Sequence, residues 1–229
     1  MKMRPYLSIR TGVAVVAVVV LAAAAVAWFQ FRQADGARDG AGGAAWLAGE
    51  SDFGGPFSLV DHTGRAVTEA DFHGKSMLIY FGYTFCPDTC PAGLSSMTLA
   101  LDLLPDKGAS VVPIFITIDP ERDTVAVLAD YVEAFHPRLV GLTGTAEQIA
   151  AVAETYRAFY TKLAVAAGDD PDDYFMGHTN TAYLVGPDGK PLTTFSGASA
   201  PETMARGIEK FLTPPSPSAA GAGREKPRK

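Results

Sequence analysis

The sequence predicts an α/β domain, with a single membrane-spanning helix before it. Three observations predict this class: an uncharged run rich in Val and Ala at 11–31, two continuous apolar runs at 76–83 and 110–119, and amphipathic segments between and after those runs. The formal net charge of −6 argues against a nucleic-acid partner.

Residues 11–31 predict a transmembrane anchor. At about 1.5 Å per residue, a helix of this length crosses a bilayer core of roughly 30 Å. Lys2, Arg4 and Arg10 precede the run, whereas the charges that follow it are balanced. The positive-inside rule therefore keeps residues 1–10 in the cytoplasm and exports the rest. A bacterial inner membrane, with the domain facing the periplasm, is the expected location.

A cleaved signal peptide is the alternative, because the small residues at 25–27 resemble a cleavage site. The length of the apolar run and the aromatic residues Trp28, Phe29 and Phe31 favour a retained anchor. In either case the exported part lies in an oxidising compartment, where an exposed thiol pair tends to form a disulfide unless it is reduced or binds metal.

The exported part divides into three segments by composition. Residues 32–50 are rich in Gly and Ala and predict a flexible linker, while 213–229 are rich in Pro and Ser, end in basic residues and predict a disordered tail. The domain between them, 51–212, is long enough to bury a core without disulfides.

The sequence of the domain predicts strands and helices in alternation. The expected elements are a hairpin of strands 56–60 and 65–67, strand 76–83, a helix from about 90, strand 110–119, helices 122–135 and 145–159, strands 181–185 and 191–195, and helix 201–212. The side chains expected to face the core are Leu94, Met97, Leu101, Leu104, Val125, Leu128, Val132, Phe135, Ile149, Val152, Tyr156, Phe159, Met204, Ile208 and Phe211. Two parallel crossovers, a second hairpin and a terminal helix make a thioredoxin-like sandwich with an N-terminal β-hairpin.

Cys86 and Cys90, the two cysteines of the chain, follow strand 76–83 directly. The free amides and dipole at the start of the next helix favour thiolates there, and Pro91 suits the first helical position. A thiolate pair can cycle through a disulfide or bind a soft metal ion. A purely structural disulfide is disfavoured, because so short a loop constrains little of the unfolded chain.

A metal site needs a third donor, and His178 is the candidate because it stands just before strand 181–185. The other histidines have ordinary roles: His62 lies in a turn, His73 precedes Gly74, and His136 ends a helix. The residues alone leave the choice between redox and metal chemistry open.

The motifs around these residues resemble the signature of the Sco/SenC family of copper-binding, thioredoxin-like proteins. The resemblance covers nearly all of 51–212, in the order of the family. Its blocks are Tyr80-Phe81-Gly82-Tyr83-Thr84-Phe85-Cys86-Pro87-Asp88-Thr89-Cys90-Pro91, Ile118-Asp119-Pro120-Glu121-Arg122-Asp123-Thr124, Gly141-Leu142-Thr143-Gly144-Thr145, Gly177-His178-Thr179 and Tyr183-Leu184-Val185-Gly186-Pro187-Asp188-Gly189.

The resemblance implies a copper chaperone that supplies the dinuclear copper centre of cytochrome c oxidase subunit II. It places Cys86, Cys90 and His178 as ligands of one copper ion, and it implies a copper donor and a thiol reductant upstream. Two thiolates and one imidazole suit Cu(I), and with water they also suit Cu(II). The chain is thus expected to be a metal carrier rather than an enzyme, apart from a thiol–disulfide reductase activity of the cysteine pair.

Four nearby features have local interpretations. Asp119 is expected to cap the next helix and to pair with Arg122. Several family members carry Asp where this chain has Gly177, which puts a carboxylate contact to the site in doubt. The acidic stretch 169–173 is expected to be a solvated loop. The alternative is a mobile loop that brings His178 to the cysteines or contacts a partner protein. Met176 is expected to pack rather than bind metal.

Two other classes remain as alternatives. A periplasmic thiol–disulfide oxidoreductase without copper transfer would resemble thioredoxin-like reductants. Those proteins have a two-residue spacer and a proline before the strand that here begins at Thr181, whereas this chain has a three-residue spacer and His178-Thr179-Asn180. A peroxiredoxin carries its threonine three residues before the reactive cysteine, but Thr84 lies two residues before Cys86.

Overall fold

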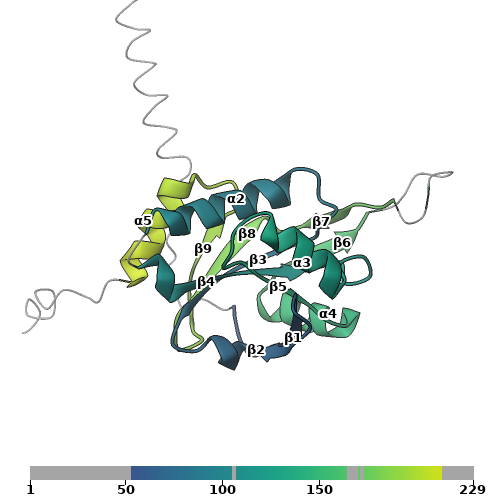
Figure 1. Cartoon of the computed structure of the whole chain (residues 1–229), viewed down its shortest axis with the longest axis horizontal. Coiled ribbons are helices and arrows are strands. Elements are labelled where there is room, and N and C mark those ends of the chain that lie inside the picture. The colour runs from purple at the N-terminus through teal and green to yellow at the C-terminus, as the bar shows by residue number, and fades with distance from the viewer. Residues whose placement is uncertain (1–52, 105–106, 164–169, 171–172, 213–229) are drawn as a thin grey trace, which may run out of the picture. The chain divides into compact units, whose positions relative to one another are not determined.

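The fold is built on a seven-stranded sheet with the order β2-β1-β5-β4-β3-β8-β9 (Figure 1). The computed structural model describes residues 53–104, 107–163, 170 and 173–212. The strands of this sheet are β1 (Ser58–Asp61), β2 (Ala66–Thr68), β3 (Ser76–Gly82), β4 (Val111–Thr117), β5 (Val140–Thr143), β8 (Thr181–Val185) and β9 (Pro191–Ser196). A separate two-stranded sheet pairs β6 (Tyr160–Lys162) with β7 (Met176–His178).

The centre of the sheet is β3, and every residue of this strand is buried. A continuous apolar run is what a strand with both faces covered requires. β3 pairs in parallel with β4, where Tyr80 lies opposite Phe115, and in antiparallel with β8, where Tyr80 lies opposite Ala182. Because β8 runs antiparallel, its beginning lies beside the end of β3. The segment before β8 therefore reaches the loop that leaves β3.

Among the described residues, four α-helices pack around the sheet. They are α2 (Thr89–Asp102), α3 (Val125–Glu133), α4 (Ala146–Thr155) and α5 (Pro201–Leu212), accompanied by the short 3-10 helices η1 (Glu69–Phe72) and η2 (Gly108–Ser110). Figure 1 shows α2 next to α5 along one side of the sheet and α4 beside β1 on the other. The start of α4 is fixed by a capping box, in which Thr145 and Gln148 satisfy each other's backbone amides.

The strand predictions are largely confirmed. The hairpin of β1 and β2, strands β3 and β4, and the antiparallel pair β8 and β9 all form where expected. The prediction for the second parallel crossover is wrong in its end point. The crossover leads to β5, which was not predicted, whereas β8 joins the sheet in antiparallel. β6 and β7 were not predicted either.

The helix predictions need correction at their ends. α3 begins at Val125, with Thr124 as its N-cap, so the role predicted for Asp119 as helix cap is wrong. α4 ends at Thr155, and Arg157 then adopts a φ of 52°, which turns the chain out of the helix. Phe159 is therefore 77% exposed instead of facing the core, and Phe211 is 40% exposed.

The predicted anchor at 11–31, the linker at 32–50 and the tail at 213–229 lie outside the described residues. Within the described ranges, no helix combines the length and the apolar character that crossing a membrane requires.

Candidate metal centre

The cysteine loop leaves the end of β3 and enters α2, with Cys86 in the loop and Cys90 as the second residue of the helix. The helix begins earlier than predicted, so Pro91 is its third residue, where a missing N–H costs no intrahelical bond. The N-cap, Asp88, makes no side-chain cap bond. Instead, Cys90 N donates to Cys86 Sγ at 3.4 Å, and Thr89 Oγ1 lies 3.3 Å from the same sulfur. The sulfur thus takes the place of a capping oxygen.

The third donor reaches this loop from β7. His178 Nε2 lies 3.2 Å from Cys90 Sγ, while Nδ1 lies 3.2 Å from the carbonyl oxygen of Thr179. Because a carbonyl only accepts hydrogen bonds, Nδ1 carries the proton and Nε2 presents its lone pair toward the sulfur. The rings of Tyr80 and Tyr83 stand nearly perpendicular to the imidazole, with centroids 6.3 and 6.0 Å away. The orientation of the imidazole is therefore fixed by its neighbours.

Cys86, Cys90 and His178 form a compact group whose ligand atoms all lie within 4.8 Å of one another. Both cysteines are free thiols and buried. The remaining histidines lie outside this group, as predicted. His62 Nδ1 accepts a hydrogen bond from Gly141 N, and His136 Nε2 lies 3.3 Å from Asp102 Oδ1.

The two thiols differ in acidity. Burial raises the pKa of the Cys86 thiol, but hydrogen bonds from the Thr89 hydroxyl and from the amides of Asp88 and Cys90 outweigh burial, so the pKa lies below its usual value. The pKa of Cys90 is raised, mainly by its complete burial and also by the neighbouring Cys86 sulfur. Cys86 is therefore the sulfur that is more readily a thiolate.

Burial lowers the pKa of His178, with a smaller opposing effect from the Thr179 carbonyl. The neutral imidazole is consequently favoured, and neutral imidazole is the form that binds metal. The group therefore offers two sulfur donors and one nitrogen donor. This soft, three-donor set fits copper, whereas structural zinc sites are typically closed by four protein ligands.

Space for the site comes from a glycine at the end of β3. A Cβ atom at Gly82 would lie 2.8 Å from Cys90 Sγ and 2.8 Å from the ring of Phe115. Any larger residue would therefore press on the Cys90 sulfur.

The cysteine loop is anchored by a residue that sequence reasoning missed. The carboxylate of Asp123 is fully buried and accepts hydrogen bonds from Thr84 N at 3.0 Å, from Thr84 Oγ1 at 2.6 Å and from Thr117 Oγ1 at 2.6 Å. These bonds join the loop before Cys86 to the end of β4. The sequence places Asp123 near the start of the predicted helix 122–135 and within one family block, and neither feature identifies its hydrogen-bond partners.

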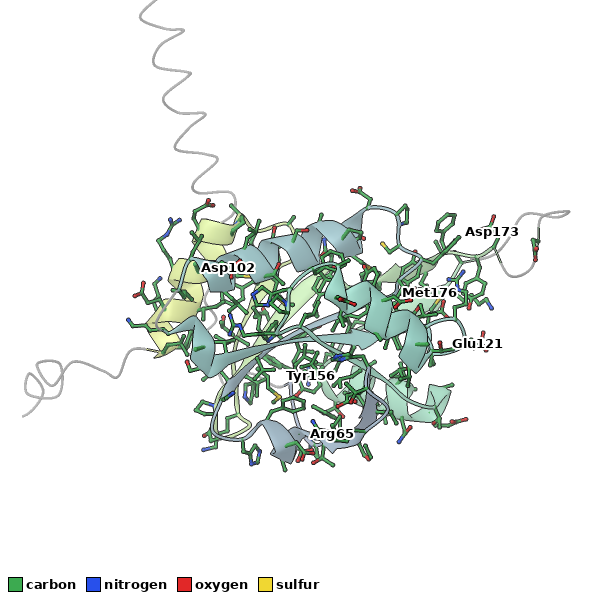
Figure 2. All side chains as sticks on the ribbon, viewed as in Figure 1. Arg65, Asp102, Glu121, Tyr156, Asp173 and Met176 are labelled. Atoms are coloured by element: carbon green, nitrogen blue, oxygen red, sulfur yellow. The ribbon has the colours of Figure 1, made fainter. Side chains whose placement is uncertain are left out.

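The hairpin residues beside His178 have structural roles. A Cβ atom at Gly177 would face Leu163 and Thr161 at 3.5 Å, because neighbouring strand residues point to opposite faces. Met176 packs against the core, as predicted, and Figure 2 labels it near Glu121 at the end of the molecule that carries β6 and β7. Most of the acidic stretch 169–173 lies outside the described residues.

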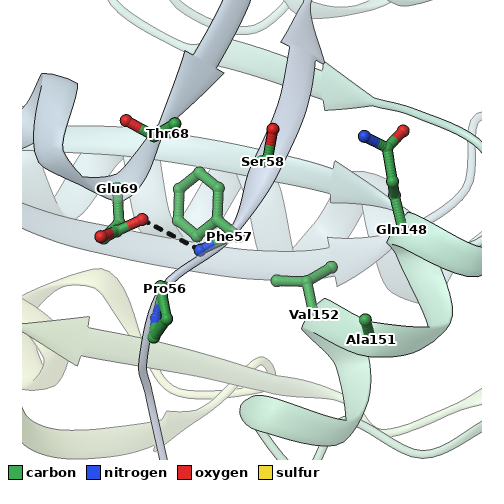
Figure 3. Close-up of a pocket in the computed structure, with 8 residues that line it drawn as sticks. All are labelled: Pro56, Phe57, Ser58, Thr68, Glu69, Gln148, Ala151 and Val152. Carbon is green, nitrogen blue, oxygen red and sulfur yellow. Dashed lines mark hydrogen bonds between the residues drawn. The ribbon is translucent and has the colours of Figure 1, made fainter.

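A pocket of about 540 Å³ elsewhere in the domain offers no comparable chemistry (Figure 3). It lies between β1 and α4, and its one titratable side chain is Glu69, which accepts a hydrogen bond from Phe57 N at 3.0 Å. The other lining residues are Pro56, Ser58, Thr68, Gln148, Ala151 and Val152.

Comparison with known proteins identifies relatives of this chain. The family model described as SCO1/SenC matches residues 47–213. A mitochondrial SCO2 homologue of Bos taurus is 44% identical over 160 residues, which cover 69% of this chain and 59% of that protein. The chain thus spans somewhat more than half the length of this relative.

Solved structures agree in fold and hold copper. Arabidopsis thaliana ScoI with copper bound is 39% identical, with a TM-score of 0.65 over 70% of this chain and 98% of that one. Bradyrhizobium japonicum ScoI with copper bound is 40% identical, with a TM-score of 0.62 over 69% of this chain and 99% of that one. The thioredoxin-like α/β fold is therefore confirmed, and the Cys-Cys-His group can hold one metal ion.

Proposed function

The chain belongs to the SCO1/SenC family, and on that premise we propose that it binds one copper ion through Cys86, Cys90 and His178 and delivers it to the dinuclear copper site of cytochrome c oxidase subunit II. The observation that carries this proposal is the convergence of three soft donors within 4.8 Å. Two thiolates favour Cu(I), and a single imidazole keeps the coordination number low enough for an acceptor to enter.

Anaerobic titration of the reduced full chain with Cu(I) tests the binding step. The wild-type chain binds one equivalent, and His178→Ala binds more weakly. The matched control is His73→Ala, because His73 is exposed and remote from the group. Equal affinity of wild type and His178→Ala would remove His178 from the site.

A separate experiment tests the delivery of copper to subunit II. The copper-loaded chain is mixed with the purified apo copper domain of subunit II, and the copper content of each protein is measured after separation. Transfer of copper supports the proposal, whereas retention on the reduced donor with a reduced acceptor present refutes delivery to this target.

Reduction of the acceptor's cysteines is a second activity, supported by the lowered pKa of Cys86 beside the buried Cys90. The Cys86 thiolate attacks the acceptor disulfide, which forms a mixed disulfide and releases one acceptor thiolate. Cys90 then loses its proton and attacks Cys86 Sγ, which yields the Cys86–Cys90 disulfide and the second acceptor thiolate. An external dithiol must restore the pair. A Cys86→Ser variant that retains full reductase activity would rule this role out.

We further propose that residues 11–31 anchor the chain in a bacterial inner membrane and that the domain faces the periplasm. The support is the uncharged run with basic residues before it. Fractionation of cells with an alkaline wash tests the anchor, since an anchored chain stays in the membrane pellet and a cleaved one is found in the soluble periplasmic fraction.

A further inference from the structure

The hairpin that carries His178 is not part of the main sheet. β6 and β7 form a sheet of their own, held by three residue pairs, Tyr160↔His178, Thr161↔Gly177 and Lys162↔Met176. An isolated two-stranded sheet is marginal in water, so contacts of its side chains decide where it lies. At the base of the hairpin, Thr179 N donates to Phe159 O at 2.9 Å, and at the opposite end Leu163 N donates to Phe175 O at 2.8 Å. These bonds join the two arms to each other, so the hairpin needs a separate attachment to the rest of the domain.

That attachment centres on Tyr174, which lies just before β7 and is only 3% exposed. Its hydroxyl donates to Asp119 Oδ1 at 2.7 Å. The guanidinium carbon of Arg122 lies 3.7 Å from the centroid of its ring, and Lys162 Nζ lies 3.4 Å from it. Arg122 Nη1 also donates to the backbone carbonyl of Tyr174 at 3.0 Å. We call Tyr174, Asp119, Arg122 and Lys162 the Tyr174 clamp.

The clamp joins the hairpin to the loop between β4 and α3. Lys162 and Tyr174 belong to the two arms of the hairpin, whereas Asp119 and Arg122 belong to the loop and form an ion pair of their own at 2.5 Å. Lys162 Nζ also lies 3.7 Å from Glu121 Oε2 in the same loop. Cations over an aromatic ring and a hydrogen bond to a carboxylate are attractive interactions with a preferred geometry, so they hold the hairpin in one position.

The same clamp contacts the cysteine loop. The guanidinium carbon of Arg122 lies 4.7 Å from the ring centroid of Phe85, the residue before Cys86. The ring centroids of Phe85 and Phe175 lie 6.0 Å apart. One arginine therefore touches both the segment that bears the imidazole donor and the segment that bears a sulfur donor.

We propose that Tyr174 is a positioning residue for the metal centre, because its clamp holds the β6–β7 hairpin so that His178 Nε2 stays at Cys90 Sγ. Tyr174 does not itself bind copper. Without the clamp the two thiolates keep their places, while the imidazole spends time away from them. The inference rests on the proposed copper-binding function and adds a residue that controls how firmly the third donor is held.

The test measures the rate at which the copper-loaded full chain loses Cu(I) to an excess of a Cu(I)-specific chelator. Tyr174→Leu removes both the ring and the hydroxyl and accelerates loss by about 10-fold, the lower end of the effect of residues that orient metal ligands. Tyr174→Phe keeps the ring under the two cations and has a smaller effect. The matched control is Tyr131→Phe, because the buried Tyr131 hydroxyl has no hydrogen-bond partner among the described residues.

A double-mutant cycle separates positioning from general destabilisation. In a His178→Ala background, Tyr174→Leu changes the rate of copper loss by less than about 2-fold, since the residue through which it acts is gone. An equal acceleration in both backgrounds, or none in the wild-type background, overturns the proposal. If Tyr174→Leu does not fold, the same cycle with Tyr174→Phe decides the question.

Hydrogen exchange of the reduced, copper-free chain provides a readout that does not involve copper. Tyr174→Leu speeds amide exchange in β7 and leaves β3 and β4 protected. Unchanged exchange in β7 overturns the clamp, even if the chain binds copper. If Tyr174→Leu speeds exchange in β7 but the wild-type chain binds no copper, the proposed function is refuted while the clamp is supported.

Discussion

His178 Nε2 lies 3.2 Å from Cys90 Sγ although 88 residues separate the two along the chain. The antiparallel pairing of β8 with β3 makes this contact, because it brings the segment before β8 to the end of the strand from which the cysteine loop leaves. The third donor thus depends on the topology of the sheet. A cysteine pair without it would be an ordinary dithiol.

Replacing Gly82 by Ala is expected to destabilise the reduced chain by about 1–3 kcal/mol, the usual cost of overpacking a core. The added Cβ would lie 2.8 Å from both Cys90 Sγ and the Phe115 ring. Urea unfolding followed by circular dichroism measures the change. Gly177→Ala is the control, since its Cβ meets neighbours only at 3.5 Å. Equal stability of the Gly82→Ala and wild-type chains would show that the space at Gly82 is not needed.

Gly177→Asp is expected to change copper affinity by less than about 2-fold, because strand alternation points this side chain away from the face of His178. The position faces Leu163 and Thr161 instead. Competition with a chelator of known affinity measures the effect. A large gain in affinity would mean that a carboxylate at 177 does reach the imidazole and that its absence weakens the site.

The buried carboxyl of Asp123 makes stability depend on pH. Burial raises its pKa, and hydrogen bonds from Thr117 and Thr84 only partly offset this. The folded chain therefore holds this proton to higher pH than the unfolded chain does. The resulting stabilisation is complete below the unfolded pKa and is lost as pH rises through the folded pKa. Asn at this position cannot ionise, and it can still accept from Thr84 N and Thr117 Oγ1.

The free energy of unfolding of the wild type, relative to Asp123→Asn, is accordingly expected to fall as pH rises from about 4 toward 7. Urea unfolding at a series of pH values measures the difference. Asp130→Asn changes an exposed carboxyl of α3 and serves as the control. A difference that is flat with pH, or that rises, would show that folding does not raise the pKa of Asp123.

Alkylation distinguishes the two cysteines. In the reduced, copper-free chain, iodoacetamide is expected to modify Cys86 about 10-fold faster than Cys90 or more, because the pKa of Cys86 is lowered and Cys90 is completely buried. Mass spectrometry of peptides reads out each site. Thr89→Val removes a hydrogen bond to the Cys86 sulfur and should slow its reaction at neutral pH. Faster modification of Cys90 would reverse the assigned roles.

The central strands and the Cys-Cys-His group could be predicted from the sequence because each part leaves a local trace. β3 is an unbroken apolar run, both cysteines follow it, and His178 stands shortly before the strand that begins at Thr181. The residues alone left the choice between redox and metal chemistry open. The resemblance to a family then predicted that the three residues bind one copper ion together. The periodicity of α4 was extended one turn too far, since nothing in the pattern marks the left-handed conformation of Arg157.

The two strands that were not predicted, β6 and β7, leave no such local pattern in the sequence. β6 and β7 are three residues each, and the Met-Gly-His of β7 has no alternation of apolar and polar residues. The anchors of the site are contacts between distant segments. Tyr174 and Asp119 are 55 residues apart, and Asp123 and Thr84 are 39 apart. Such contacts follow from the folded topology, so single-sequence patterns do not reveal them.

X-ray absorption spectroscopy of the full chain loaded with one equivalent of Cu(I) examines the donor set itself. We expect a first shell of two sulfurs and one nitrogen, and we expect the nitrogen contribution to disappear in His178→Ala but to persist in His73→Ala. A copper shell of sulfur alone in the wild-type chain, or a nitrogen that survives in His178→Ala, would show that Cys86, Cys90 and His178 do not bind the ion together.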